Sequence, residues 1–158
     1  MHVRRVRPDD REWMADAITA SFASTRLVSR GRVHDDASVL DGYVVEIDGR
    51  PIGCALWREI EGDAELVVIV TTYRGAGAGG ALLDAVVDHA RTVGWKRLWL
   101  VTTNDNTDAM RLYQRAGWEW VGFHRDSVTD ARTLKPELPD AGNHGIEIRH
   151  EIEFEYPL

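Results

Sequence analysis

The stretch "TTYRGAGAGG", residues 71–80, holds six glycine or alanine residues directly after one arginine, Arg74. The residues before it, "AELVVIV" at 64–70, form an apolar run that is too short for a helix and indicates a buried strand. The residues after it, "ALLDAVVDHARTVGW" at 81–95, repeat apolar side chains at helical spacing. The glycines therefore lie where a strand turns into a helix.

This junction favours the binding of an anion. The first N–H groups of a helix have no partner inside the helix, and the helix dipole is positive at that end. Glycine and alanine leave those N–H groups accessible to a phosphate. A flexible linker would be rich in Gly and Ser and would separate domains rather than two strongly patterned elements. We therefore interpret residues 74–79 as a phosphate-binding turn.

Length and composition are those of one soluble domain, residues 1–158, with a core of its own. The net charge of −7 and the absence of a long basic run argue against a general nucleic-acid binder and are compatible with a cationic substrate. The N-terminus lacks the apolar segment of a signal peptide, and no segment is long enough to span a membrane, so we expect a cytoplasmic protein without a membrane partner. The single cysteine, Cys54, lies in an apolar stretch and is expected to be a buried thiol.

Hydrophobic periodicity predicts a mixed sheet with helices packed on it, an α/β fold. The expected strands are 2–8, 42–47, 51–60, 64–70, 96–103, 118–125 and 146–156, and the expected helices are 9–24, 80–93 and 104–117. Asp48-Gly49 between two strands is typical of a tight hairpin. Residues 24–41 look irregular apart from one short helix, and 124–145 form a long connection with a helical stretch at 127–134.

Two familiar phosphate-binding motifs fit the glycine turn poorly. A P-loop ends in Gly-Lys-Ser/Thr, whereas Gly80 is followed by Ala81-Leu82. The dinucleotide pattern G-x-G-x-x-G is present at residues 75–80, and Asp105 follows the next strand where a ribose-binding acid is sought. That fold, however, begins with its glycine turn and continues in parallel units, whereas here a hairpin comes first. A dinucleotide-dependent oxidoreductase remains the less favoured alternative.

A third pattern matches better. "RGAGAGGALL" resembles the pyrophosphate loop of the GNAT acyltransferase superfamily, Arg/Gln-x-x-Gly-x-Gly/Ala opening a helix, with Arg74, Gly77 and Gly79 at the matching positions. "NTDAMRLYQRAGW" at 106–118 is similar to its second signature, Asn-x-x-Ala-x-x-Leu-Tyr-x-x-x-Gly-Phe, with Trp118 in place of the phenylalanine. Two signatures in the right order are more specific than either alone. The resemblance implies a GNAT-like fold, a mixed and mostly antiparallel central sheet flanked by helices.

The resemblance also implies acetyl-CoA, or another acyl-CoA, as the donor. The pyrophosphate would lie on the turn formed by Arg74, Gly75, Ala76, Gly77, Ala78 and Gly79. The amide-containing pantetheine arm would run along the preceding strand at Val67 and Ile69. Asn106 would lie near the cofactor at the start of the next helix, although a plain helix cap is an alternative role for the same residue.

An amine attacks a thioester only when it is deprotonated. A lysine-like amine has a pKa of ~10.4, so at neutral pH roughly one molecule in a thousand is deprotonated. Forming the neutral amine therefore costs about 4 kcal/mol. Glu65 is the expected base, because it is the one acid in the apolar strand and matches the position from which many family members supply a glutamate. A solvent-facing charge is the alternative role, and Glu59, Glu61 and Asp63 are alternative bases.

For Tyr113 the resemblance implies a hydrogen bond to the leaving thiolate, and ordinary aromatic packing is the alternative. No Ser-His-Asp or Cys-His set is arranged for an acyl-enzyme, so we expect an N-acetyltransferase that uses direct attack in a ternary complex. The acceptor would be a small-molecule or peptide amine, and the protein a monomer or homodimer without nucleic-acid partner. A non-catalytic acyl-CoA-binding sensor is the main rival function.

The histidines lack ligand spacing, so no metal is expected. Trp57 and Trp118 are expected near the acceptor cleft.

Overall fold

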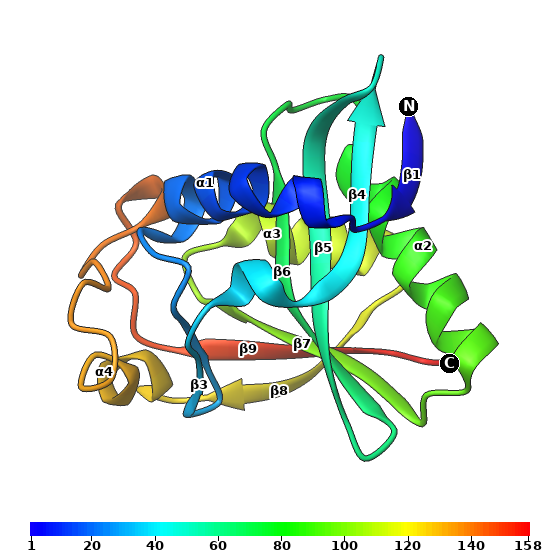
Figure 1. The fold of residues 1–158 in the computed structure, drawn as a ribbon. Coiled ribbons are helices and arrows are strands. Elements are labelled where there is room, and N and C mark those ends of the chain that lie inside the picture. The colour runs from blue at the N-terminus through cyan, green and yellow to red at the C-terminus, as the bar shows by residue number, and fades with distance from the viewer.

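Alternating apolar strands build a seven-stranded sheet in the order β1-β4-β5-β6-β7-β9-β8, with helices on both faces (Figure 1). The computed structural model describes all residues, 1–158. The strands are β1 (His2–Arg5), β2 (Leu27–Ser29), β3 (Arg32–His34), β4 (Asp41–Ile47), β5 (Arg50–Ile60), β6 (Asp63–Thr71), β7 (Arg97–Thr103), β8 (Glu119–His124) and β9 (Glu151–Tyr156). The helices are α1 (Arg11–Phe22), α2 (Ala78–Val93), α3 (Thr107–Arg115) and α4 (Ser127–Ala131), with single 3-10 turns at Pro8–Asp10, Ala37–Val39 and Asn143–Gly145.

The sheet is mixed and mostly antiparallel, as predicted. Only β6 and β7 pair in parallel, through the crossover that contains α2. Every other neighbouring pair in the large sheet is antiparallel. A dinucleotide-binding fold needs a largely parallel, doubly wound sheet, so the oxidoreductase alternative does not fit this topology.

Two apolar cores lie on opposite faces of the sheet. One contains the buried side of α2, including Leu82, Leu83 and Val86, together with Tyr113 from α3. The other contains Met14 of the buried side of α1, packed with apolar side chains from β4, β5 and β6. In Figure 1, β4, β5 and β6 run up the picture whereas β8 and β9 run across it, so the two halves of the sheet point in different directions. No helix combines the length and apolar character that a bilayer crossing requires.

The structure differs from the sequence prediction at 24–41 and at 146–150. The first segment forms the hairpin β2–β3, whose two turn residues, Arg30 and Gly31, both have positive φ. The last strand begins at Glu151 rather than at residue 146. The reason is that the side-chain oxygen of Asn104 accepts the backbone N–H groups of Arg149 and His150, at 2.9 and 3.0 Å, so these groups do not continue the ladder.

The two tryptophans expected at the cleft lie in the core instead. Trp57 is 4% exposed and packs beneath α2, with ring centroids 4.8 Å from His89 and 5.4 Å from Trp95. Trp118 is 2% exposed and packs against Tyr113 and Tyr156. Cys54 is fully buried, as predicted.

A buried ion pair fixes the N-terminus to the sheet and to the start of α1. The guanidinium of Arg4 donates two hydrogen bonds to Asp10, both at 2.8 Å, and one to Glu46 at 2.9 Å. Asp10 also accepts the backbone N–H of Arg7 at 2.7 Å, and its side chain makes no capping hydrogen bond to α1. The hydrogen bond from Arg4 holds the pKa of Asp10 below its ordinary value.

We expect Asp10→Ala to destabilise the protein by roughly 3 kcal/mol, because it leaves the guanidinium of Arg4 buried and short of a partner. Urea unfolding at neutral pH measures this change. Asp41→Ala is the matched control: its partner, Arg5, is largely exposed, and such surface pairs contribute about 0–1 kcal/mol. Equal losses in the two variants would contradict a special role for the Arg4–Asp10 pair.

Candidate active site

Strands β6 and β7 pair over only three residues and then separate. The parallel register joins Asp63–Glu65 to Arg97–Trp99, and beyond it β6 continues to Thr71 and β7 to Thr103 without further pairing. Glu65 is therefore the last residue of β6 that is paired with β7. We call this point, where the two strands part, the fork.

A β-bulge directly follows the fork. Trp57 lies opposite Leu66 and its neighbour Leu56 lies opposite Val68, so Val67 is the extra residue. A bulge bends its strand and increases the local twist, which turns β6 away from β7. The predicted cofactor residues Val67 and Ile69 thus lie on a strand whose β7 side has no strand partner.

The glycine turn lies at the far end of this open edge. Gly75 and Gly77 have φ values of 85° and 74°, a region that other residues rarely adopt. A Cβ built on either residue would meet no protein atom within 4 Å, so backbone conformation rather than crowding requires glycine there. At Gly79 a Cβ would lie 3.0 Å from Leu112 of α3, so this glycine allows α2 and α3 to pack closely.

Helix α2 begins two residues earlier than predicted, at Ala78, with Gly77 as its N-cap. Ala78 and Gly79 therefore belong to the first helical turn, whose N–H groups have no partner inside the helix. The first intrahelical bond runs from Ala81 N–H to the carbonyl of Gly77, at 3.1 Å. These bare N–H groups and the small residues around them fit a pyrophosphate, the group for which the turn was predicted.

Helix α3 brings two further predicted residues to this region. The side chain of Asn106 caps α3 by accepting the N–H of Ala109 at 3.3 Å. Arg74 is 90% exposed at its side chain and lies 3.6 Å from Asp108 in the first turn of α3. An exposed pair of this kind contributes little to stability, which leaves the Arg74 guanidinium available to an anion.

Tyr113 lies on the buried side of α3. It is 4% exposed and packs against Phe154, with 5.5 Å between ring centroids. Its hydroxyl makes no hydrogen bond within the protein, and burial raises the pKa of Tyr113 above its ordinary value. The phenol therefore keeps its proton at neutral pH and can donate a hydrogen bond.

Glu65 is buried rather than facing solvent. It is 2% exposed, and its Oε1 accepts a hydrogen bond from the hydroxyl of Ser29, at the end of β2. Its Oε2 has no hydrogen-bond partner. Burial raises the pKa of Glu65 above its ordinary value, and the hydrogen bond from Ser29 opposes this change.

His34 completes a buried cluster with Ser29 and Glu65. Its Nε2 lies 2.9 Å from Ser29 Oγ and 3.8 Å from Glu65 Oε2. Burial, followed by the charges of Arg58 and Arg32, lowers the pKa of His34 to about 4, so the ring is neutral at pH 7. A serine hydroxyl has one proton. Since Ser29 gives it to Glu65, Nε2 of the neutral His34 must donate to Ser29 Oγ, so His34 acts on the carboxylate only through Ser29.

This cluster is not arranged as a nucleophilic triad. In such a triad the acid bonds one nitrogen of the histidine and the serine approaches the other. Here Ser29 and Glu65 both approach Nε2 of His34, and the serine hydroxyl donates to the acid itself. Ser29 therefore holds the carboxylate.

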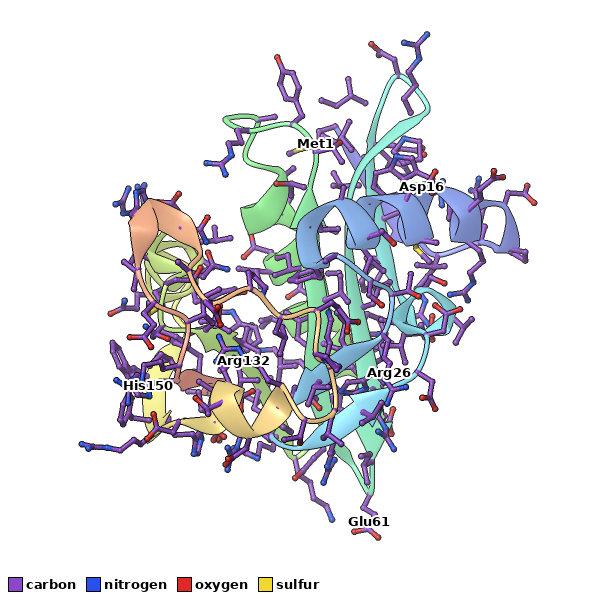
Figure 2. All side chains as sticks on the ribbon, turned by 90° about the vertical axis from the view of Figure 1, so that its left-hand side faces the viewer. Met1, Asp16, Arg26, Glu61, Arg132 and His150 are labelled. Atoms are coloured by element: carbon purple, nitrogen blue, oxygen red, sulfur yellow. The ribbon has the colours of Figure 1, made fainter.

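A second buried glutamate holds the same hairpin. Glu151, at the start of β9, accepts the backbone N–H of Arg30 at 3.2 Å and the hydroxyl of Ser127. Figure 2 views the molecule from the side where the hairpin β2–β3 and α4 lie close to each other. Glu65 and Glu151 thus bind the hairpin at two points, and the hairpin covers the fork.

The sequence missed Ser29 and His34 because residues 24–41 seemed irregular. The available signal was "LVSRGRVH", residues 27–34, in which Arg30-Gly31 separates two short β-forming runs. The long connection 124–145 is anchored by Lys135, which is 2% exposed and donates to the carbonyl of Phe22 at 2.8 Å. No three His, Cys, Asp or Glu side chains gather in a way that could hold a metal ion.

We expect Glu65→Gln to stabilise the protein at pH 8 and to lose this advantage as the pH falls toward the ordinary glutamate pKa of 4.5. Because the folded pKa is raised, the native state holds a proton that the unfolded state lacks between 4.5 and the folded value. Wild-type stability therefore decreases as the pH rises through that window, whereas glutamine does not titrate. Thermal unfolding from pH 4.5 to 8 measures the difference.

Glu61→Gln is the control for this series. Glu61 is exposed at the tip of the β5–β6 hairpin, labelled in Figure 2, and makes no ion pair within 4 Å. Its effect on the melting temperature should be small at every pH. A Glu65→Gln difference that does not change with pH would show that burial of the charge is not the cause.

Comparisons with known proteins agree with this geometry. The sequence model of the acetyltransferase (GNAT) family matches residues 7–118. The Bacillus subtilis protein YdhI, itself uncharacterised, is 37% identical over 116 residues, which are 73% of this chain and 72% of the relative.

Solved structures show the same fold. An IAA acetyltransferase from Bacillus cereus superposes with a TM-score of 0.70 at 20% identity and covers 99% of both chains. A GNAT family acetyltransferase from Elizabethkingia anophelis with acetyl-CoA bound has a TM-score of 0.69 at 20% identity and covers 99% of this chain and 97% of its own. With the family match spanning most of its length, from just after β1 to just before β8, the chain belongs to the acetyltransferase (GNAT) family and is an acetyltransferase.

Proposed function

We propose that this protein transfers an acetyl group from acetyl-CoA to a primary amine by direct attack in a ternary complex. The observation that carries the proposal is Glu65 at the fork: a buried carboxylate, held by Ser29 through one oxygen and unpartnered at the other. It adjoins an open strand edge that leads to the glycine turn.

The donor side of the proposal rests on this edge and this turn. The N–H groups around Gly77 would bind the pyrophosphate, with Arg74 as a nearby positive charge. The pantetheine arm carries amides, which pair with an unpaired strand edge as an added strand does. Val67 and Ile69 are the residues of β6 that would accept it, and Asn106 caps the helix that adjoins the turn.

Glu65 would act as the base. A base works best when its pKa lies near the working pH, and burial moves the pKa of Glu65 upward, in that direction. Ser29, which is itself hydrogen-bonded to His34, keeps the carboxylate oriented while Oε2 stays free for the amine or for one bridging water.

The proposed acetyl transfer begins with the amine in its protonated form. The ammonium gives one proton to Glu65, and the free amine attacks the thioester carbonyl carbon. A C–N bond forms, the C–S bond breaks, and the nitrogen releases its second proton while the thiolate accepts one. The net products are the N-acetyl amine, CoA thiol and one proton. Tyr113 would donate a hydrogen bond to the developing thiolate, because its raised pKa makes full proton transfer from the phenol unfavourable.

We expect Gly77→Val to abolish acetyl-CoA binding, because the branched side chain would occupy the phosphate position. It should also cost about 1–3 kcal/mol of stability, since valine is strained at a φ of 74°. Calorimetric titration of the folded variant with acetyl-CoA measures the affinity. Gly80→Ala is the control: it adds a Cβ in open space within α2, so it should keep the affinity and stabilise the helix by roughly 0.5–1 kcal/mol. Normal affinity of Gly77→Val for acetyl-CoA would refute the proposed phosphate-binding turn.

We expect Glu65→Gln to lose most activity near neutral pH, by at most roughly a thousandfold, and to recover as the pH approaches the pKa of the amine. The solvent then deprotonates the amine. Tyr113→Phe should lose less, and high pH should not restore it, because raising the pH supplies no donor to the thiolate. Profiles of kcat/KM against pH for both variants make the comparison.

A constant deficit of Glu65→Gln at every pH would exclude Glu65 as the base. A wild-type protein that binds acetyl-CoA but releases no CoA thiol with any amine would favour the sensor function instead. Thermal shifts complete the comparison: saturating acetyl-CoA at ~100 times its Kd should stabilise the protein by about 2.7 kcal/mol, and NADPH should give no shift.

A further inference from the structure

A cavity of about 380 Å³ opens beside Glu65, and no part of the donor site accounts for it. Its walls come from β3, from the β5–β6 hairpin and from the start of β7. Figure 2 locates this end of the molecule, because Glu61 at the hairpin tip contributes to the wall. The cavity lies at the opposite end of β6 from the glycine turn.

The sheet places three different side chains in one row at this cavity. Arg58 of β5 lies directly opposite Glu65, and Trp99 of β7 lies directly opposite it on the other side. Residues opposite each other in paired strands project from the same face. A guanidinium, the buried carboxylate and an indole therefore follow one another across three strands.

Three cations of the cavity have no partner. Arg32, Arg58 and Lys96 make no side-chain hydrogen bond and no ion pair within 4 Å. Arg97 differs, because Glu153 and Glu155 each accept from it at 2.8 Å and it lies over the ring of Trp99.

Two unpaired acids, Glu61 and Asp63, also line this cavity, near the hairpin tip. Arg32 and Arg58 lie nearer Glu65: burial raises the pKa of Glu65, and both positive charges oppose that rise. The same two charges add to the effect of burial in lowering the pKa of His34. At the fork, the cavity is therefore lined by one carboxylate, Glu65, and by two guanidinium groups, Arg32 and Arg58, that make no hydrogen bond or ion pair.

We propose that this cavity binds the acceptor, and that the acceptor is an amine that also carries an anionic group, a carboxylate or a phosphate. This inference rests on the proposed function, in which Glu65 receives the proton of the amine. Arg58 and Arg32 bind the anion, because guanidinium groups form paired, charge-assisted hydrogen bonds with both anions. Their positive charges also favour the neutral form of the neighbouring amine, the form that attacks.

The experiment compares matched amines that differ only in the anion: phenylalanine with 2-phenylethylamine, and O-phosphoethanolamine with ethanolamine. CoA thiol release gives kcat/KM for each. The anionic member of at least one pair should be preferred by about tenfold or more, the size expected for a hydrogen-bonded charge. The pair that shows the preference identifies the anion as carboxylate or phosphate.

Arg58→Gln should remove that preference, so that kcat/KM of the anionic member of the pair falls to within about twofold of that of the neutral member. Arg50→Gln is the matched control, on the same strand but eight residues away, roughly 27 Å along β5. It should keep the preference. Equal kcat/KM within both pairs, or a preference that survives Arg58→Gln, would overturn the proposal.

Binding separates this inference from the proposed function. Calorimetry with the same four amines, in the presence of CoA, measures acceptor affinity without turnover. If no amine is acetylated, the proposed function fails, yet tighter binding of an anionic amine that depends on Arg58 would still support the cavity assignment. Equal binding of charged and neutral amines would refute it.

Discussion

The short parallel pairing between β6 and β7 is the constraint on which the rest of this structure depends. Three residues of each strand pair, and the bulge at Val67 then bends β6 away. Without the separation, the backbone of β6 beyond Glu65 would be satisfied by β7 and would offer nothing to a cofactor. The glycine turn and α2 follow at the end of the open edge. The separation of the two strands therefore places Glu65, the open edge and the turn in order along β6 and its continuation.

A second requirement follows, because Glu65, the proposed base at the fork, is buried. A carboxylate without water needs hydrogen bonds, and the ladder cannot supply them to a side chain. Ser29 supplies one from a hairpin more than thirty residues earlier in the chain, and His34 of the same hairpin bonds Ser29. Glu151 fixes this hairpin from β9. Glu65 keeps one oxygen unpartnered, an arrangement that lowers stability and is typical of functional sites.

Local patterns predicted the elements that depend on local physics. The glycine turn, the strand before it and the helix after it were recognisable because backbone freedom, apolar runs and helical periodicity act within a few residues. Gly77 and Gly79 were identified, yet for reasons that only the structure separates: positive φ at one, and contact with Leu112 at the other. The burial of Glu65 was not predictable, because a hairpin distant in sequence causes it. Trp57 and Trp118 were misplaced since aromatic residues suit a cleft and a core equally well.

Overall charge is a poor guide to the charges around Glu65, because these too depend on residues that are distant in the sequence. The net charge of −7 suggested compatibility with a cationic substrate, but net charge describes solubility and long-range attraction rather than one cavity. Around Glu65 the sheet places Arg58 in the same row, and the hairpin brings Arg32 beside it, while acids of β9 are occupied by Arg97. A bare amine would meet two positive charges there at close range. An amine with its own anion, the acceptor that we propose, would turn that repulsion into binding and would present its nitrogen, in neutral form, to the free oxygen of Glu65.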